Sequence, residues 1–332
     1  MIEIGGVKAQ KGERVTGFLE AGKMANGCTL KIPVIIVNGK EEGPTLWLNG
    51  AVHGDELNGI VAIRKVAFDI EPDELKGSLI CTPVCNLVAF QARHKVSNFD
   101  YLDLDQQFPG NPNGAHSERI AYLLFEQIKN NASYLINFHT LGRHSLARPY
   151  TVFKLVSETD KEILEEVENV AKVFGVHLNC KVDITIPASE LPGNRMGALD
   201  VNCTKKGIPA FMAEMGSGGR FEPENIEIAC QGIKNVMNYL KMIPGEPQGV
   251  KEQIIIPERD FIRCNEAGFV FMKVKPYDFV KKGSTLACLT DFFGNTIEEI
   301  IAPRDCYVIT ALFDPVVNTG DQICLIGFLD KN

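Results

Sequence analysis

The chain has 332 residues, of which 45% are hydrophobic, and a formal net charge of −8. This length suggests about two domains and a sizeable core, and the acidic balance argues against a nucleic-acid or anionic-membrane binder. The N-terminus has no apolar run of the signal-peptide type, and no run approaches the ~20 residues of a membrane span. The ten cysteines are scattered along the chain, which favours reduced thiols and a cytoplasmic location.

Strand-like and helix-like segments alternate over most of the first 242 residues. This alternation predicts an α/β domain over residues 1–242, with a β-rich N-terminal segment and a mixed sheet flanked by helices. In chain order, the expected elements are strands at 13–19, 29–37 and 45–48, a helix at 58–68, a strand at 78–83, a helix at 117–130, strands at 134–138 and 151–156, helices at 160–174 and 197–205, a strand at 209–214 and a helix at 224–241.

The pattern changes after a linker-like segment rich in Pro and Gly at 242–249. Short apolar runs then recur between turn signals of Gly, Asn and Asp. These runs cover residues 269–274, 285–289, 298–301, 306–312 and 322–328. They predict a small all-β domain, barrel-like or sandwich-like, over residues 251–332.

Three potential metal ligands follow or end predicted strands. His53 and Glu56 lie three residues apart between a strand and a helix, a spacing that can place both on one face. His139 directly follows the strand predicted at 134–138. Sites in such sheets form at the carboxyl ends of strands, and two His with one Glu plus a position for water is a recurring catalytic zinc set. The pattern therefore predicts one Zn²⁺ per chain and a zinc hydrolase.

Glu214 ends another apolar strand, where a lone carboxylate is costly to bury. Desolvation there would raise its pKa, which suits a group that takes up and releases a proton. We therefore predict that Glu214 is catalytic.

Five motifs occur in a fixed order along the chain. They are His53-Gly-Asp-Glu56, the segment Asn86–Arg93, the segment Asp103–Gly110, Phe138-His139-Thr140 and Ala213-Glu214-Met-Gly216. Together they resemble the succinylglutamate desuccinylase/aspartoacylase family, a branch of the zinc carboxypeptidase-like hydrolases. The resemblance covers most of the chain, including the C-terminal β domain, and implies the zinc-carboxypeptidase-like fold.

The resemblance also implies roles for single residues. Zinc would be held by His53, Glu56 and His139, Glu214 would act as general base and acid, and Arg93 would polarise the scissile carbonyl. The implied reaction is hydrolysis of a small N-acylated amine or amino acid to a carboxylic acid and a free amine. The partner is then a small molecule, and a homo-oligomer is compatible with the family.

One segment departs from the family pattern. The family has Asp-Leu-Asn-Arg before Phe-Pro-Gly, and its Asn-Arg pair holds a substrate carboxylate, whereas this chain has Asp105-Gln106 there. Arg is a bidentate partner of carboxylates, Gln is not, and Asp105 would repel one. We predict that the amine side of the substrate is neutral or cationic near Asp105. Alternatively, Arg195 or Arg143 binds a carboxylate from another direction.

Two rival functions stay open. A zinc carboxypeptidase acting on peptides needs a carboxylate clamp, and Asp105-Gln106 removes the familiar one. A non-catalytic binding protein on the same fold has no need of Glu214 together with all three ligand candidates. The C-terminal domain is also similar to biotinyl and lipoyl carrier domains, but it lacks a Lys near Arg304-Asp305. We therefore expect it to cover the active site or to serve assembly.

Overall fold

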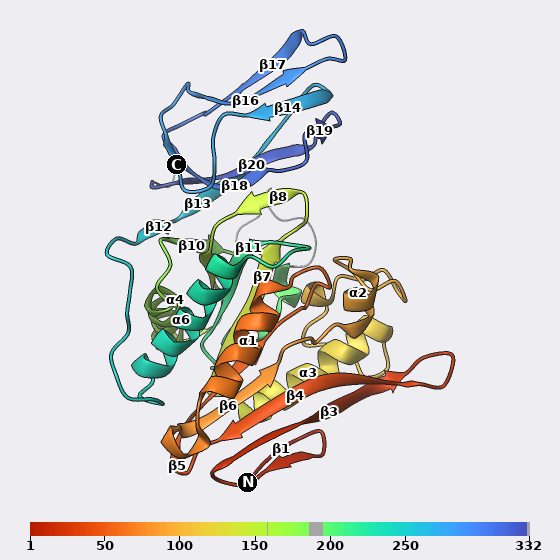
Figure 1. Cartoon of the computed structure of the whole chain (residues 1–332), viewed down its shortest axis with the longest axis vertical. Helices are drawn as coiled ribbons and strands as arrows, with labels where there is room; N and C mark the ends of the chain where they lie inside the picture. Colours follow the sequence, from red (N-terminus) through yellow and green to blue (C-terminus); the bar gives the residue numbers. More distant parts are fainter. Residues whose placement is uncertain (158, 186–194, 331–332) are drawn as a thin grey trace.

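The computed structural model describes residues 1–157, 159–185 and 195–330. A nine-stranded sheet in the order β12-β10-β9-β11-β7-β5-β6-β4-β3 runs through it (Figure 1). Its strands are β3 (Glu13–Lys23), β4 (Thr29–Asn38), β5 (Glu41–Asn49), β6 (Lys76–Thr82), β7 (Tyr134–Leu141), β9 (Tyr150–Leu155), β10 (Leu178–Asp183), β11 (Ala210–Ser217) and β12 (Ile254–Ile256). The four central strands from β11 to β6 pair in parallel, whereas β9 and β4 pair antiparallel to their central neighbours. The predicted mixed sheet is confirmed.

Helices cover both faces of this sheet. On one face, α1 (Asn58–Asp69), α4 (Lys161–Val173) and α6 (Pro223–Tyr239) bury apolar side chains against the central strands. On the other face, α3 (His116–Asn131) and α5 (Leu199–Thr204) contribute to a second core around Trp47. Both cores follow from apolar residues at helical spacing, such as Ile120, Leu124 and Ile128 of α3. Among the helices of the described ranges, none has the length and apolar composition needed to cross a membrane.

Most predicted elements are present, with small differences at their ends. The helix expected at 197–205 is a 3-10 turn, η3 (Arg195–Gly197), followed by the short α5. Several elements were not predicted, among them α2 (Leu87–Ala92), β10 and the short strands at 145–147, 254–256 and 258–263. The sequence of β10, Leu-Asn-Cys-Lys-Val-Asp, alternates apolar and polar residues, a strand signal that was missed in the prediction. Its strand conformation comes from pairing with β9 and β12 on its two sides.

The C-terminal part is all β over its described residues. One sheet holds β13 (Glu258–Arg263), β20 (Gln322–Phe328), β18 (Cys306–Leu312) and β15 (Phe279–Val280), and the other holds β17 (Thr296–Ile301), β16 (Thr285–Thr290), β14 (Gly268–Met272) and β19 (Val316–Val317). These strands enclose their own apolar core.

Two strands link the C-terminal part to the rest of the molecule. The short strand β8 (Ser145–Ala147) pairs with β18 of the C-terminal sheet, and β12 pairs with β10 of the nine-stranded sheet although it follows the linker-like segment. An apolar cluster that includes Tyr150, Ile309 and Leu325 fills the junction. The C-terminal strands therefore lie against the main sheet next to β9 and β10. The domain boundaries at 242 and 251 stay a prediction.

Candidate functional site

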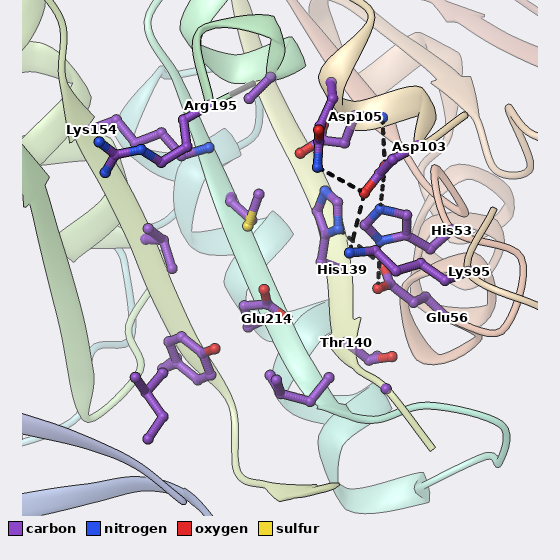
Figure 2. Close-up of a pocket in the computed structure, with 18 of the residues that line it drawn as sticks. His53, Glu56, Lys95, Asp103, Asp105, His139, Thr140, Lys154, Arg195 and Glu214 are labelled. Carbon is purple, nitrogen blue, oxygen red and sulfur yellow. Dashed lines mark hydrogen bonds and ion pairs between the residues drawn. The ribbon is translucent and has the colours of Figure 1, made fainter. Parts of the chain in front are cut away.

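A cavity of about 370 Å³ lies on one face of the nine-stranded sheet. Side chains alternate along a strand, and the alternate positions 150, 152 and 154 of β9 and 212 and 214 of β11 line the cavity, as does 139 of β7. The intervening Phe138, Phe153 and Ala213 belong to the core under α1, α4 and α6. In the view of Figure 2, the histidines lie on one side of the cavity, Lys154 and Arg195 on the other, and Glu214 between them.

The three predicted metal ligands form one cluster, the metal group His53, Glu56 and His139. Each offers a ligand atom within 4.8 Å of the others, and all three residues are buried. His53 Nδ1 lies 2.7 Å from Glu56 Oε1, and His139 Nδ1 lies 3.0 Å from Glu56 Oε2. The residues come from the loop after β5 and from β7, two neighbouring strands of the sheet.

The metal group has the chemistry of a cation site. Glu56 Oε2 is buried and makes no contact with hydrogen-bond geometry, despite its closeness to His139. Burial lowers the pKa of His53, but Glu56 and Asp103 outweigh burial and raise the pKa well above its usual value. Burial raises the pKa of Glu56, and the two histidines outweigh it and lower the pKa to about 2. The group therefore favours positive charge between its members, and its two imidazoles and one carboxylate fit Zn²⁺.

Both histidines are oriented by a second polar residue. Asp103 Oδ1 lies 2.9 Å from His53 Nε2, and Asn137 Nδ2 lies 2.8 Å from His139 Nε2. Asn137 is held in turn by Asn49, whose Nδ2 donates to Asn137 Oδ1 at 2.9 Å. Such outer partners fix the ring orientation of metal-ligating histidines. Neither Asp103 nor Asn137 was singled out for this role from the sequence, although Asp103 lies in a quoted motif.

The loop that carries His53 and Glu56 is held against α2. A Cβ atom at Gly54 would lie 1.9 Å from the carbonyl carbon of Ala89, so only glycine fits there. Asn86 caps α2 by accepting from Ala89 N, and its Nδ2 donates to the carbonyl oxygen of Val52 at 2.9 Å. The motif that begins at Asn86 therefore supports the metal group through the backbone next to His53.

Glu214 lies opposite His139 in the parallel pairing of β11 and β7. Its Oε2 is buried without a hydrogen-bond partner. Burial raises the pKa of Glu214 to about 7, against a smaller lowering by His139. A carboxyl group that titrates near neutrality beside a metal group can both accept and donate a proton.

The cavity wall holds three further charged residues, here called the charged end. Lys154 and Arg195 lie across the cavity from the histidines, and Asp105 lies beside Asp103 on the histidine side (Figure 2). Asp105 accepts weakly from Leu199 N at 3.4 Å and from Asn137 Nδ2 at 3.5 Å. Burial raises the pKa of Asp105, while His139 and Lys154 lower it by less. Gln106 also lines the cavity, and its Nε2 donates to Asp103 Oδ2 at 3.3 Å.

The structure places a different basic residue in the cavity from the one predicted. Arg93 is exposed at the C-cap of α2, with φ of 54°, and is not among the residues that line the cavity. Lys95, two residues later, lines the cavity, and its Nζ lies 3.1 Å from Asp103 Oδ2. Arg143 is also outside the lining, with its Nε 3.9 Å from Asp55 Oδ2. The basic cluster from Arg93 to Lys95 was a visible signal, but spacing alone does not say which member turns inward.

The C-terminal strands complete the wall of the cavity. Arg259 and Phe261 of β13 and Leu325 of β20 line it together with Tyr150 of β9. The sequence suggested a covering role for this part but no residue for it.

Comparisons with known proteins agree with this arrangement. Residues 42–240 match the family described as the succinylglutamate desuccinylase/aspartoacylase catalytic domain. The chain is 28% identical over 302 residues to the N-alpha-acetyl-L-2,4-diaminobutyric acid deacetylase of Halomonas elongata, covering 89% of this chain and 85% of the relative.

Solved structures show the same fold. A succinylglutamate desuccinylase/aspartoacylase from Rhodobacter sphaeroides superposes with a TM-score of 0.83 at 25% identity over 95% of each chain. The product-bound ectoine utilization protein EutE from Ruegeria pomeroyi superposes with a TM-score of 0.84, again at 25% identity over 95% of each chain. The family match spans more than half of the chain and includes His53, Glu56, His139 and Glu214. The chain therefore belongs to the succinylglutamate desuccinylase/aspartoacylase family, whose members hydrolyse amides as deacylases.

Proposed function

We propose that this protein is a zinc-dependent deacylase that hydrolyses a small N-acylated amino acid to a carboxylic acid and a free amine. The observation that carries the proposal is the buried group of His53, Glu56 and His139 in one cavity with Glu214. His53, Glu56 and His139 would hold the metal. When bound, zinc supplies Lewis-acid polarisation of the acyl carbonyl and makes water a nucleophile near neutral pH.

Glu214 carries the proton in this proposal. It takes the proton from the attacking water and delivers it to the leaving nitrogen, which otherwise leaves poorly as an amine anion. A pKa of about 7, raised by burial, matches both transfers.

We assign the cation that faces the developing oxyanion to Lys95 instead of Arg93. Both side chains are exposed, but Lys95 lines the cavity and Arg93 does not. Asp103 contacts both Lys95 Nζ and His53 Nε2, so one carboxylate positions the ammonium and a metal ligand together. Burial lowers the pKa of Lys95, but Asp103 outweighs it and raises the pKa, so the side chain stays positively charged.

Asp105 supports a substrate with a cationic amine side. It is a carboxylate with only long hydrogen bonds in the cavity wall, and an ammonium group would satisfy it. The Halomonas relative is named for an N-acetylated diamino acid, which carries a second amine. We therefore propose an N-acyl diamino acid as the substrate class.

The two rival functions have weaker support. A peptide carboxypeptidase would need to admit a chain, whereas the cavity of about 370 Å³ is walled by β9, β11 and the C-terminal strands and suits a small molecule. A non-catalytic protein has no use for a buried Glu214 without a hydrogen-bond partner for Oε2.

Hydrolysis of three matched compounds by the zinc-loaded protein tests the proposal. The compounds are N-α-acetyl-diaminobutyrate, N-acetyl-aminobutyrate, which lacks the second amine, and the monoacetylated diamine, which lacks the carboxylate. We expect turnover that falls about 10²–10⁴-fold in Glu214→Gln with zinc still bound. A variant that keeps full turnover, or a zinc-loaded protein that hydrolyses none of these and only C-terminal peptide bonds, would contradict it.

A further inference from the structure

Lys154 is an unusual residue for the wall of an apolar strand. It follows Tyr150 and Val152 on the cavity side of β9 and is only 6% exposed. Lysines are rarely this buried unless they are paired. Its partner is Asp200 of α5, which is 1% exposed and accepts from Lys154 Nζ at 2.7 Å.

This ion pair is poorly explained as a source of stability. Burying two charges costs desolvation energy, and apolar residues of similar volume often serve as well or better. Moreover, Asp200 Oδ2 is buried without a hydrogen-bond partner, so the pair is incompletely satisfied. Within the described residues, Asp200 is the sole hydrogen-bond acceptor of Lys154 Nζ. An ammonium group has three N–H donors, so Lys154 retains donor capacity at the cavity.

We propose that Lys154, held in the wall by Asp200, binds the carboxylate of the substrate and replaces the arginine that the chain lacks at Gln106. This inference rests on the proposed deacylase function and names what selects its substrate. Arg195 lines the same end of the cavity and adds positive charge there. Asp105 lies within electrostatic range of Lys154. The charged end thus offers a cation for a carboxylate and an anion for an ammonium, which matches an amino acid with a second amine.

The position of Lys154 on β9 fits this role. Tyr150 of β9 lies opposite Glu214 of β11, and Lys154 is four residues further along the strand, about 13 Å at the usual rise. A small substrate bound at Glu214 and the metal group therefore has room to extend toward the ammonium. Figure 2 shows Lys154 and Glu214 in the same pocket, separated along the strand direction.

The test compares the wild-type protein with the double variant Lys154→Met/Asp200→Asn. The two substitutions together remove both charges and leave no buried carboxylate unpaired. We expect KM for N-α-acetyl-diaminobutyrate to rise about 10–100-fold, the loss of one charged hydrogen bond. The value of kcat should change far less, and KM for the monoacetylated diamine should stay the same. Lys154→Arg should restore part of the affinity because it keeps the charge.

Lys181→Met provides the matched control. Lys181 lies on the neighbouring strand β10, pairs with Glu168 at 2.9 Å, and is not in the cavity lining. Its loss should change neither KM. Equal effects of the double variant on both compounds, or no effect on either, would overturn the role of Lys154.

A second measurement separates this inference from the proposed function. Calorimetric binding of free diaminobutyrate and of the corresponding diamine needs no turnover. Selective loss of diaminobutyrate binding in the double variant supports Lys154 even if the wild-type protein hydrolyses none of the acetylated compounds. Unchanged binding of both ligands refutes it even if the deacylase activity is present.

Discussion

The two ends of the cavity are built in different ways. At the metal group, every imidazole nitrogen of His53 and His139 has a polar neighbour within 3.0 Å, and Asp103 and Asn137 hold the rings from behind. At the charged end, Asp105 has only long hydrogen bonds, and Lys154 has one acceptor in the described structure.

This difference suggests a division of labour. Imidazole rings with a polar neighbour at each nitrogen are fixed in place, as metal ligands need to be. Groups that keep unused donor or acceptor capacity in a cavity wall can exchange it for a ligand. We therefore expect substitutions at the metal group to affect the chemical step and metal binding, and substitutions at the charged end to affect the choice of substrate.

The largest effect should come from the metal group itself. Glu56→Gln removes the carboxylate that lies between the two histidines, so zinc binding and turnover should both be abolished. Zinc should raise the melting temperature of the wild-type protein but not of the variant, because ligand binding to the native state adds to its stability. As a control, His177→Ala changes a half-buried histidine outside the cavity and should leave zinc stoichiometry unchanged. A Glu56→Gln protein that binds stoichiometric zinc would contradict the assignment of metal binding to the metal group.

Lys95 should matter next, and more than Arg93. Lys95→Met removes the cation near the metal group and should lower kcat about 10²–10³-fold, the usual loss of one oxyanion donor. Arg93→Met changes an exposed residue two positions away and should have no such effect. Steady-state kinetics of the two variants on one substrate measure both. The reverse order would restore the prediction made for Arg93.

Asp103 should act through His53. Asp103→Asn keeps the shape of the side chain but removes the charge beside His53 Nε2, so zinc affinity should fall about 10–100-fold. Competition with a chelator of known affinity measures this change, and excess zinc should recover much of the lost activity. Unchanged zinc affinity would show that Asp103 serves only Lys95 and Gln106.

Substitution of Asp105 should have the smallest effect on the rate of hydrolysis and a clear effect on the preference between substrates. Asp105→Asn should reduce the preference for N-α-acetyl-diaminobutyrate over N-acetyl-aminobutyrate by about tenfold, within the range of one charged hydrogen bond. The ratio of the two kcat/KM values is the readout. If the ratio is unchanged while both kcat/KM values fall together, Asp105 supports His139 through Asn137 and does not bind the second amine of the substrate.

Much of the metal group, and Glu214 beside it, could be predicted from the sequence because the signals are local. His53, His139 and Glu214 each follow or end an apolar run, and parallel strands bring such positions to one edge of a sheet. The structure brings these residues into one cavity, and their roles stay proposals. The choice between Arg93 and Lys95 was not local, since Lys95 lines the cavity where it pairs with Asp103 of the following motif.

The role of Lys154 at the charged end was not predicted from the sequence, for a different physical reason. The strand β9 is buried on both faces, so its sequence shows no alternation that would assign Lys154 to the cavity. In addition, a lysine at the end of an apolar run is usually a solvent-exposed residue where a strand reaches the surface. Its burial depends on Asp200, 46 residues later on α5.

The sequence by itself determined the type of chemistry, because residue identity and strand-end position select a His–Glu–His group and a buried glutamate. Only the tertiary structure decided which cations line the cavity and which strands close it. Arg259, Phe261 and Leu325 reach it from C-terminal strands that pack against β9 and β10. Local patterns report neighbours along the chain, whereas the lining of a cavity is set by contacts between segments that are distant in sequence.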